Sequence, residues 1–136
     1  MPSTEYAFYL SVPSFSRENS LLAVYFNNAV HLWDLRTGEL FKKLKTHYAS
    51  YLTFSQNGDL LAVSNYADAI EIWDPHEGIR IHTISTSDPT GLAFSSDGSL
   101  LAVGGKNGTI RLFETASWTL LRTMVGNNEE SINHLT

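Results

Sequence analysis

Apolar and polar residues alternate along much of this chain with the period of two that is typical of β-strands. Residues 70–73 read Ile-Glu-Ile-Trp, and residues 110–113 read Ile-Arg-Leu-Phe. In such a segment the aliphatic side chains face one side of a sheet and the aromatic side chain faces the other. Runs of four apolar residues, Leu-Leu-Ala-Val, precede these segments. They are too short for helices and suit strands that are covered on both faces, so the pattern predicts an all-β fold.

The whole pattern occurs three times. The sequence Phe-Ser-x-x-x-x-Leu-Leu-Ala-Val, with x any residue, begins at Phe15, Phe54 and Phe94, spacings of 39 and 40 residues. An aromatic anchor follows in each copy, 40 residues from the next, at Trp33, Trp73 and Phe113. Repetition at a fixed period indicates one supersecondary unit that is stacked, because a single unit cannot bury its apolar faces alone.

Turn signals divide each unit into four short strands. In the second unit we expect strands at residues 51–55, 60–64, 69–73 and 79–84. Glycines that follow Asn, Asp, Thr or Glu mark the reversals, at Gly38, Gly58, Gly78, Gly98 and Gly108. Asn107-Gly108-Thr109 also fits an N-glycosylation pattern, but Asn-Gly is a strong hairpin signal and we interpret it as a turn.

A unit of four strands whose third strand ends in Trp-Asp resembles the blade of a WD40-repeat β-propeller. The dipeptide is intact at Trp33-Asp34 and Trp73-Asp74 and is replaced by Phe113-Glu114 in the third unit. The resemblance implies three four-stranded antiparallel blades of an incomplete propeller, at about residues 10–44, 51–84 and 91–124, with residues 125–136 beginning a fourth. It also implies structural roles for Trp33, Asp34, Trp73, Asp74 and Phe113.

One feature of the family is missing. Where WD40 repeats often carry Ser or Thr in the second strand, this chain has Val24, Val63 and Val103. The buried His–Ser–Asp–Trp hydrogen-bond network that the resemblance implies is therefore not expected to be complete in any blade. We expect these blades to depend on apolar packing instead.

Composition and charge argue against several classes of function. The net charge of −5 and the pI near 5.4 argue against a nucleic-acid surface. Lysines cluster only at residues 42–45, on a predicted outermost strand, where Lys commonly blocks edge-to-edge pairing. The chain has no cysteine, and no apolar run is long enough to span a membrane. We expect a cytoplasmic protein without a membrane partner.

Signatures of catalysis are missing from the sequence. It contains no Gly-x-Ser-x-Gly, no phosphate-binding Gly-x-x-x-x-Gly-Lys and no His-Glu-x-x-His. We therefore expect no catalytic, cofactor-binding or metal-binding residues, and a non-catalytic scaffold for protein–protein interaction, as part of a larger propeller protein. Two alternatives remain: a propeller enzyme whose active site lies at the end of the central channel, and an adaptor associated with nucleic acid.

The resemblance places partner binding where the second strand of a blade meets the third and where one blade leads into the next. Aromatic and polar residues gather at these connections, at Tyr25, Phe26, His47, Tyr48, Tyr66 and Asp68. Tyr gives a large contact area at a small entropic cost, which suits an interface. A second interpretation stays open, in which the rings fill the junction between the first two blades.

The two terminal blades have one neighbour each, although their strands carry the same apolar pattern as the middle blade. Repeat proteins normally protect such ends with polar capping units. We therefore expect either further propeller blades or a second copy of the chain to cover the outer faces.

Overall fold

The computed structural model describes residues 13–16, 18, 20–65, 69–86, 89–106 and 108–126. The described chain forms twelve strands: β1 (Ser14–Ser16), β2 (Leu21–Phe26), β3 (Ala29–Asp34), β4 (Glu39–Lys45), β5 (Ala49–Phe54), β6 (Leu61–Asn65), β7 (Ala69–Asp74), β8 (Ile79–Ser85), β9 (Pro89–Phe94), β10 (Leu100–Gly105), β11 (Thr109–Glu114) and β12 (Thr119–Val125).

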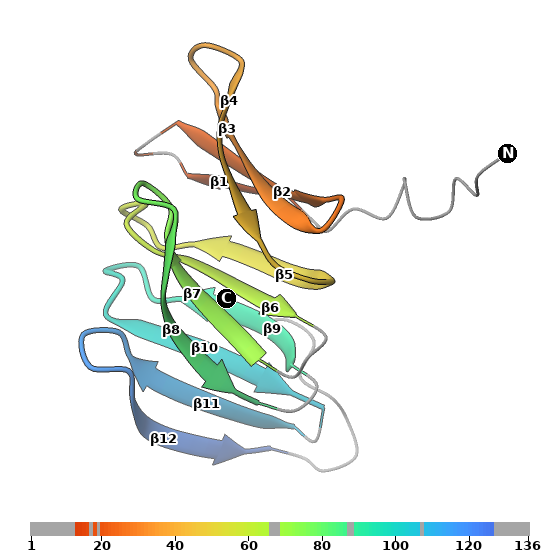
Figure 1. Ribbon diagram of the computed structural model, residues 1–136. Helices are drawn as coiled ribbons and strands as arrows, with labels where there is room; N and C mark the ends of the chain where they lie inside the picture. Colours follow the sequence, from red (N-terminus) through yellow and green to blue (C-terminus); the bar gives the residue numbers. More distant parts are fainter. Residues whose placement is uncertain are drawn as a thin grey trace, which may run out of the picture.

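These strands make three four-stranded antiparallel sheets, each in sequence order: β1-β2-β3-β4, β5-β6-β7-β8 and β9-β10-β11-β12. We call them blades one, two and three. Figure 1 shows them stacked in the order of the chain. The predicted all-β fold of three such sheets is confirmed. The predicted beginning of a fourth blade, after residue 126, lies outside the described residues.

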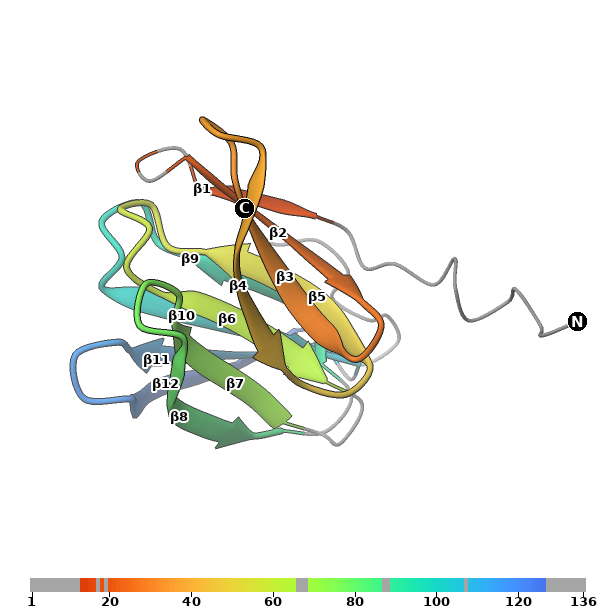
Figure 2. The same ribbon diagram turned by 45° about the horizontal axis from the view of Figure 1, so that its top comes forward.

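The blades converge at their first strands. Between neighbouring sheets, β1 lies closest to β5, and β5 closest to β9. The fourth strands lie at the far side of each sheet: every residue of β12 is exposed, and most residues of β4 and β8 are exposed. Figure 2 shows the same arrangement from a second side. Sheets that approach at their first strands and end in exposed fourth strands have the radial order of propeller blades.

The third and fourth strands of every blade share one irregularity. The register shifts between Leu32 and Trp33, between Ile72 and Trp73, and between Leu112 and Phe113. The anchor aromatic of each repeat therefore marks a β-bulge, which leaves one residue of the fourth strand without a partner. The repeat in sequence is also a repeat in backbone geometry.

Positive φ angles confirm the predicted turns. Gly38 (76°) and Gly78 (74°) lie between the third and fourth strands, where an L side chain would be strained. Blade three has no glycine there, and Trp118 adopts a φ of 58° in its place. Its amide donates to the carbonyl of Glu114, as the amide of Gly78 does to Asp74. We did not predict this turn, because it lacks the glycine signal.

The core lies between the blades rather than within one sheet. One cluster joins the second, third and fourth strands of blade one to the first three strands of blade two, and includes Leu32, Leu44, Leu61 and Trp73. The second cluster joins blades two and three in the same way. Each interface thus packs the aliphatic side of one blade on the aromatic side of the next.

Candidate functional site

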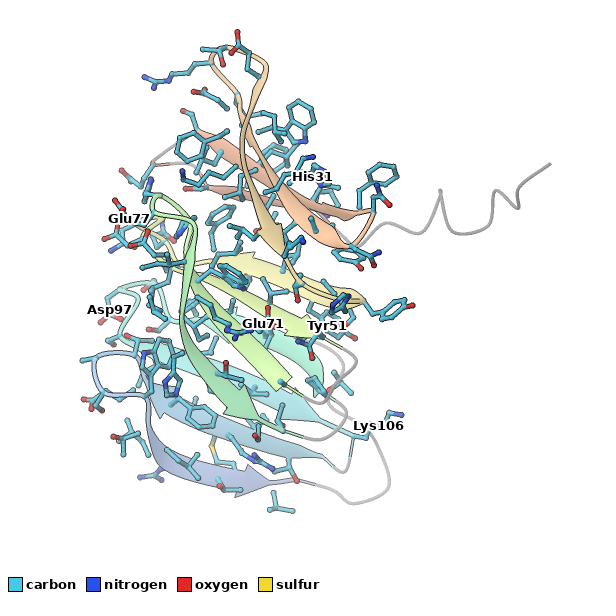
Figure 3. All side chains as sticks on the ribbon, viewed as in Figure 1. His31, Tyr51, Glu71, Glu77, Asp97 and Lys106 are labelled. Carbon is cyan, nitrogen blue, oxygen red and sulfur yellow. The ribbon has the colours of Figure 1, made fainter. Side chains whose placement is uncertain are left out.

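The two ends of the blades differ, and one of them carries the residues expected to bind a partner. We call this end the rim. It comprises the turns between second and third strands and the connections between blades, which in the described chain are residues 26–28, 45–51, 86 and 104–109 without residue 107. Figure 3 labels Tyr51 and Lys106 toward this end and Glu77 and Asp97 at the opposite one.

Tyr25 lies beneath the rim rather than on it. Its side chain is only 3% exposed and belongs to the cluster between blades one and two. The hydroxyl accepts a hydrogen bond from the amide of Tyr48 at 2.7 Å and lies 3.4 Å from the side-chain oxygen of Asn28. Tyr25 therefore connects the turn after β2 to the segment that leads into β5. Its geometry favours the packing interpretation for this residue.

Other predicted residues do reach the surface. Tyr48 is 56% exposed and has a φ of 53°, and its amide is fixed by the Tyr25 hydroxyl. His47 beside it is exposed. Phe26 is also exposed, but its ring lies 5.9 Å from that of His31, on the outer side of blade one. Tyr66 and Asp68 lie outside the described residues.

Sequence reasoning missed one aromatic residue of the rim. Tyr51 is exposed near the start of β5, after a register shift between Ala49 and Tyr51. Its amide donates to the hydroxyl of Ser64 at 3.1 Å. Because the shift follows Ala49 directly, strand alternation counted from the sequence does not give the direction of this side chain. The rim thus presents Tyr48 and Tyr51 from the segment that joins blades one and two.

A pocket of about 120 Å³ opens at the same end, between blades two and three. Its lining consists of Thr86, Val103, Gly104, Gly105, Lys106, Thr109 and Arg111. Arg111 is half-buried on β11, and no hydrogen bond or ion pair joins its guanidinium to a described residue. The adjacent glycines have no side chains that would fill the space. A half-buried guanidinium beside hydroxyl and backbone groups suits a carboxylate or another small anion.

Charge separates the two ends within the described ranges. The described part of the rim carries Lys45 and Lys106 and no Asp or Glu, while Asp68 and Asp88 of the same connections lie outside the described residues. The turns at the opposite end carry most of the acidic residues, at Glu18, Asp34, Glu39, Asp59, Asp74, Glu77, Asp97 and Glu114.

The turn at Asp97 is held by hydrogen bonds to its carboxylate. Its carboxylate accepts hydrogen bonds from the amide and hydroxyl of Ser99, at 3.0 and 2.7 Å, and from the hydroxyl of Ser95 at 2.8 Å. These bonds, the Ser99 amide first, lower the pKa of Asp97 from 3.8 to about 2. Asn57 holds the equivalent turn of blade two through Ser55 and Asp59. These groups close turns and leave no free acid–base pair.

Blade two contains a buried polar network that the sequence did not suggest. Glu71 is buried, and its carboxylate accepts from Asn65 Nδ2 at 3.1 Å, from Trp73 Nε1 at 3.0 Å and from Arg80 Nη1 at 3.3 Å. The expected loss of the family's network is consistent with Trp73 donating to Glu71. The expectation that packing would be apolar alone is wrong for this blade. Glu71 and Arg80 could have been noticed as opposite charges on neighbouring strands.

The anchor dipeptides lie at the ends of the third strands. Asp34 and Asp74 cap the turns after β3 and β7, each accepting the amide two residues later at 2.9 Å. Trp73 and Phe113 are buried between blades, whereas Trp33 is partly exposed. Among the described residues, no three His, Asp or Glu side chains are grouped to hold a metal ion. Within the same ranges, no helix is long and apolar enough to cross a membrane.

Comparison with known proteins agrees with this geometry. Residues 78–114 match the family model "WD domain, G-beta repeat". The matched segment runs from the start of β8 to the end of β11, so it includes the outer strand of blade two and three strands of blade three. No curated protein matches the chain in sequence.

Among solved structures, the chain is similar to hydrazine synthase of Kuenenia stuttgartiensis. The TM-score is 0.77 at 20% identity, over 87% of this chain and 36% of that one. At this identity the likeness shows the fold alone. The chain spans little more than a third of the length of that enzyme chain.

Proposed function

Since the chain contains a WD40 repeat and is built from propeller blades, we propose that it is a non-catalytic module for protein–protein interaction that binds its partner at the rim. The observation that carries this proposal is the exposure of Tyr48 and Tyr51 at one end of the blades. Large aromatic side chains are the residues that most often dominate binding energy at protein interfaces.

Hydrogen bonds fix the backbone amides of both tyrosines before a partner binds. The Tyr48 amide is bonded to Tyr25, whose ring is buried, and the Tyr51 amide is bonded to Ser64. A residue whose backbone is fixed before binding loses less conformational entropy when its partner arrives. The rim therefore offers contact area at a small ordering cost.

The residues that line the pocket between blades two and three favour one chemical group on the partner. Arg111 and Lys106 line it, together with the hydroxyl-bearing Thr86 and Thr109. A carboxylate entering this pocket would meet a half-buried guanidinium that no described residue neutralises. We propose that the partner presents an acidic side chain here, while its apolar groups lie on the tyrosines.

A catalytic role has less support. The buried carboxylate of Glu71 is engaged by three donors, and Asp97 is held in a turn at the acidic end. General acid–base catalysis needs a titratable group within reach of a substrate in a cleft. The pocket holds cations and hydroxyls but no acid or histidine among its lining residues. A saturable turnover abolished by one point substitution would overturn the non-catalytic proposal.

We propose that the protein acts in the cytoplasm, so the test uses a partner captured there and two matched double variants of the chain. Tyr48→Ala with Tyr51→Ala alters the rim, and Ile79→Ala with Ile81→Ala removes apolar side chains of comparable exposure from β8. A partner captured by the native chain is purified, and its affinity for each variant is measured by calorimetry. We expect the rim variant to bind at least about 30-fold more weakly, since truncating an interface hot spot costs about 2 kcal/mol or more. Equal affinities for both variants would refute rim binding.

A further inference from the structure

The three repeats allow each face of a blade to be compared with its counterparts. We call the side that carries the first-strand Phe and the anchor aromatic the aromatic face, and the opposite side of strands three and four the aliphatic face. In blade two, Phe54 and Trp73 of the aromatic face are each 7% exposed, because the aliphatic face of blade one covers them. The aliphatic face of blade two, with Ile70 and Ile72, is buried against blade three.

The outer faces at the two ends of the stack are the exceptions. On blade one, the counterparts of Phe54 and Trp73 are Phe15 and Trp33, which are 63% and 38% exposed. On blade three, Ile110 and Leu112 are half-buried, and Met124 is 38% exposed. Among the described residues, no aliphatic face covers blade one and no aromatic face covers blade three. The aliphatic face of blade three is the kind of surface that covers an aromatic face elsewhere in the stack, and the aromatic face of blade one is the kind that covers an aliphatic face.

The contacts at the turns between third and fourth strands show that the aliphatic and aromatic faces match in more than their apolar character. Between blades one and two, Lys42 lies over Gly78, with its Cδ 2.8 Å from the position that a Cβ on Gly78 would take. Between blades two and three, the equivalent positions are His82 and Trp118, whose rings stack at 5.4 Å. Each interface thus pairs one strand-four residue with one turn residue.

At the open ends the same two positions are occupied by Arg122 and Gly38. Gly38 has no heavy atom within 4 Å of the place where a Cβ would lie. A long cation over a glycine repeats the chemistry of Lys42 over Gly78. The residues left unmatched at the two ends therefore form the pair that a third interface of this kind would use.

We propose that a second copy of this chain covers both faces, with blade three of each copy packed on blade one of the other and Arg122 lying over Gly38 of the second copy. A head-to-tail contact of this type closes into a ring when the rotation permits. Two copies supply six of the described four-stranded sheets, within the four to eight blades of typical propellers. The assembly does not depend on the rim being a binding site.

The test measures mass by light scattering coupled to size exclusion at micromolar concentration. The native chain should have about twice the 15.1 kDa mass of one chain. Phe15→Asp places a charge on the open aromatic face, and Met124→Asp places one on the open aliphatic face. Each substitution affects both interfaces of a two-copy ring, so each variant should run as a single chain with an unchanged circular dichroism spectrum. Ile81→Asp, on exposed β8 of the middle blade, is the matched control and should leave the dimer intact.

Mixing the two variants tests the head-to-tail arrangement. The Phe15→Asp chain keeps its aliphatic face and the Met124→Asp chain keeps its aromatic face, so an equimolar mixture should regain a two-chain species through one native interface. A native chain that is a cooperatively melting monomer would overturn the proposal and indicate that other segments or other proteins cover the faces. A dimer broken by only one of the two substitutions, or native filaments that do not close, would also overturn it.

Discussion

The hydroxyl of Tyr25 accepts a hydrogen bond from the amide of Tyr48, 23 residues later in the chain, at 2.7 Å. This contact joins the last part of β2 to the connection between blades one and two. It also holds Tyr48 in the left-handed region of φ, which a tyrosine does not favour. A buried ring thus positions an exposed one.

Removing this hydroxyl should therefore destabilise the fold. In Tyr25→Phe the part-buried amide of Tyr48 loses its acceptor, and we expect the free energy of unfolding to fall by about 1–2 kcal/mol. Urea denaturation followed by tryptophan fluorescence measures the change. Tyr51→Phe is the control, because this side chain is exposed and lies outside the clusters, so the loss of its hydroxyl should cost less than about 0.5 kcal/mol. Equal stabilities of the two variants would show that the hydrogen bond contributes nothing.

The carboxylate of Glu71 should be one of the most sensitive groups in the chain. In Glu71→Ala, the Nε1 of Trp73 and the amide of Asn65 lose a charged acceptor in a buried site, and we expect a loss of about 3 kcal/mol. Equilibrium denaturation of the variant tests this value. Glu77→Ala changes an exposed acid and should stay within about 0.5 kcal/mol of the native protein. A Glu71→Ala chain as stable as Glu77→Ala would mean that the network is not formed.

Asp97 gives a pH-dependent prediction. Its folded pKa is about 2, below the 3.8 of the free side chain, so the carboxylate stabilises the fold above pH 3.8. This contribution should be lost as the pH falls through about 2. Titration of the Asp97 carboxyl resonance by NMR measures the pKa directly. In Ser99→Ala, with one donor removed, the pKa should rise toward 3.8; a native value already near 3.8 would contradict the described turn.

The repeat predicted the strands well, because the period of two and the turn glycines are local signals. In blade two the expected strand at residues 69–73 is observed at Ala69–Asp74, and the one at 79–84 at Ile79–Ser85. The turn at Trp118 escaped prediction because its φ of 58° is imposed by the repeat geometry and not by a glycine. Its stacking on His82 is a contact between blades, which no pattern within one blade reveals.

The site was less predictable than the fold. Placing Tyr25 required knowing which side of β2 faces blade two, and Tyr51 follows a register shift that alternation does not reveal. Glu71 resembles any polar residue of an alternating strand until Asn65 and Arg80 are brought beside it by β6 and β8. These residues depend on contacts between strands and blades, whereas sequence patterns report only the periodicity along one strand.

Site-specific photocrosslinking inside cells tests directly whether the rim is where this protein binds its partner. A photoreactive amino acid is placed at Tyr51 on the rim or at Ile79, an exposed position at the other end of the blades. Rim binding predicts a discrete crosslinked protein from position 51 that is lost when Arg111 is changed to Met, and no such product from position 79. The same crosslinked protein from position 79, with none from position 51, would contradict it.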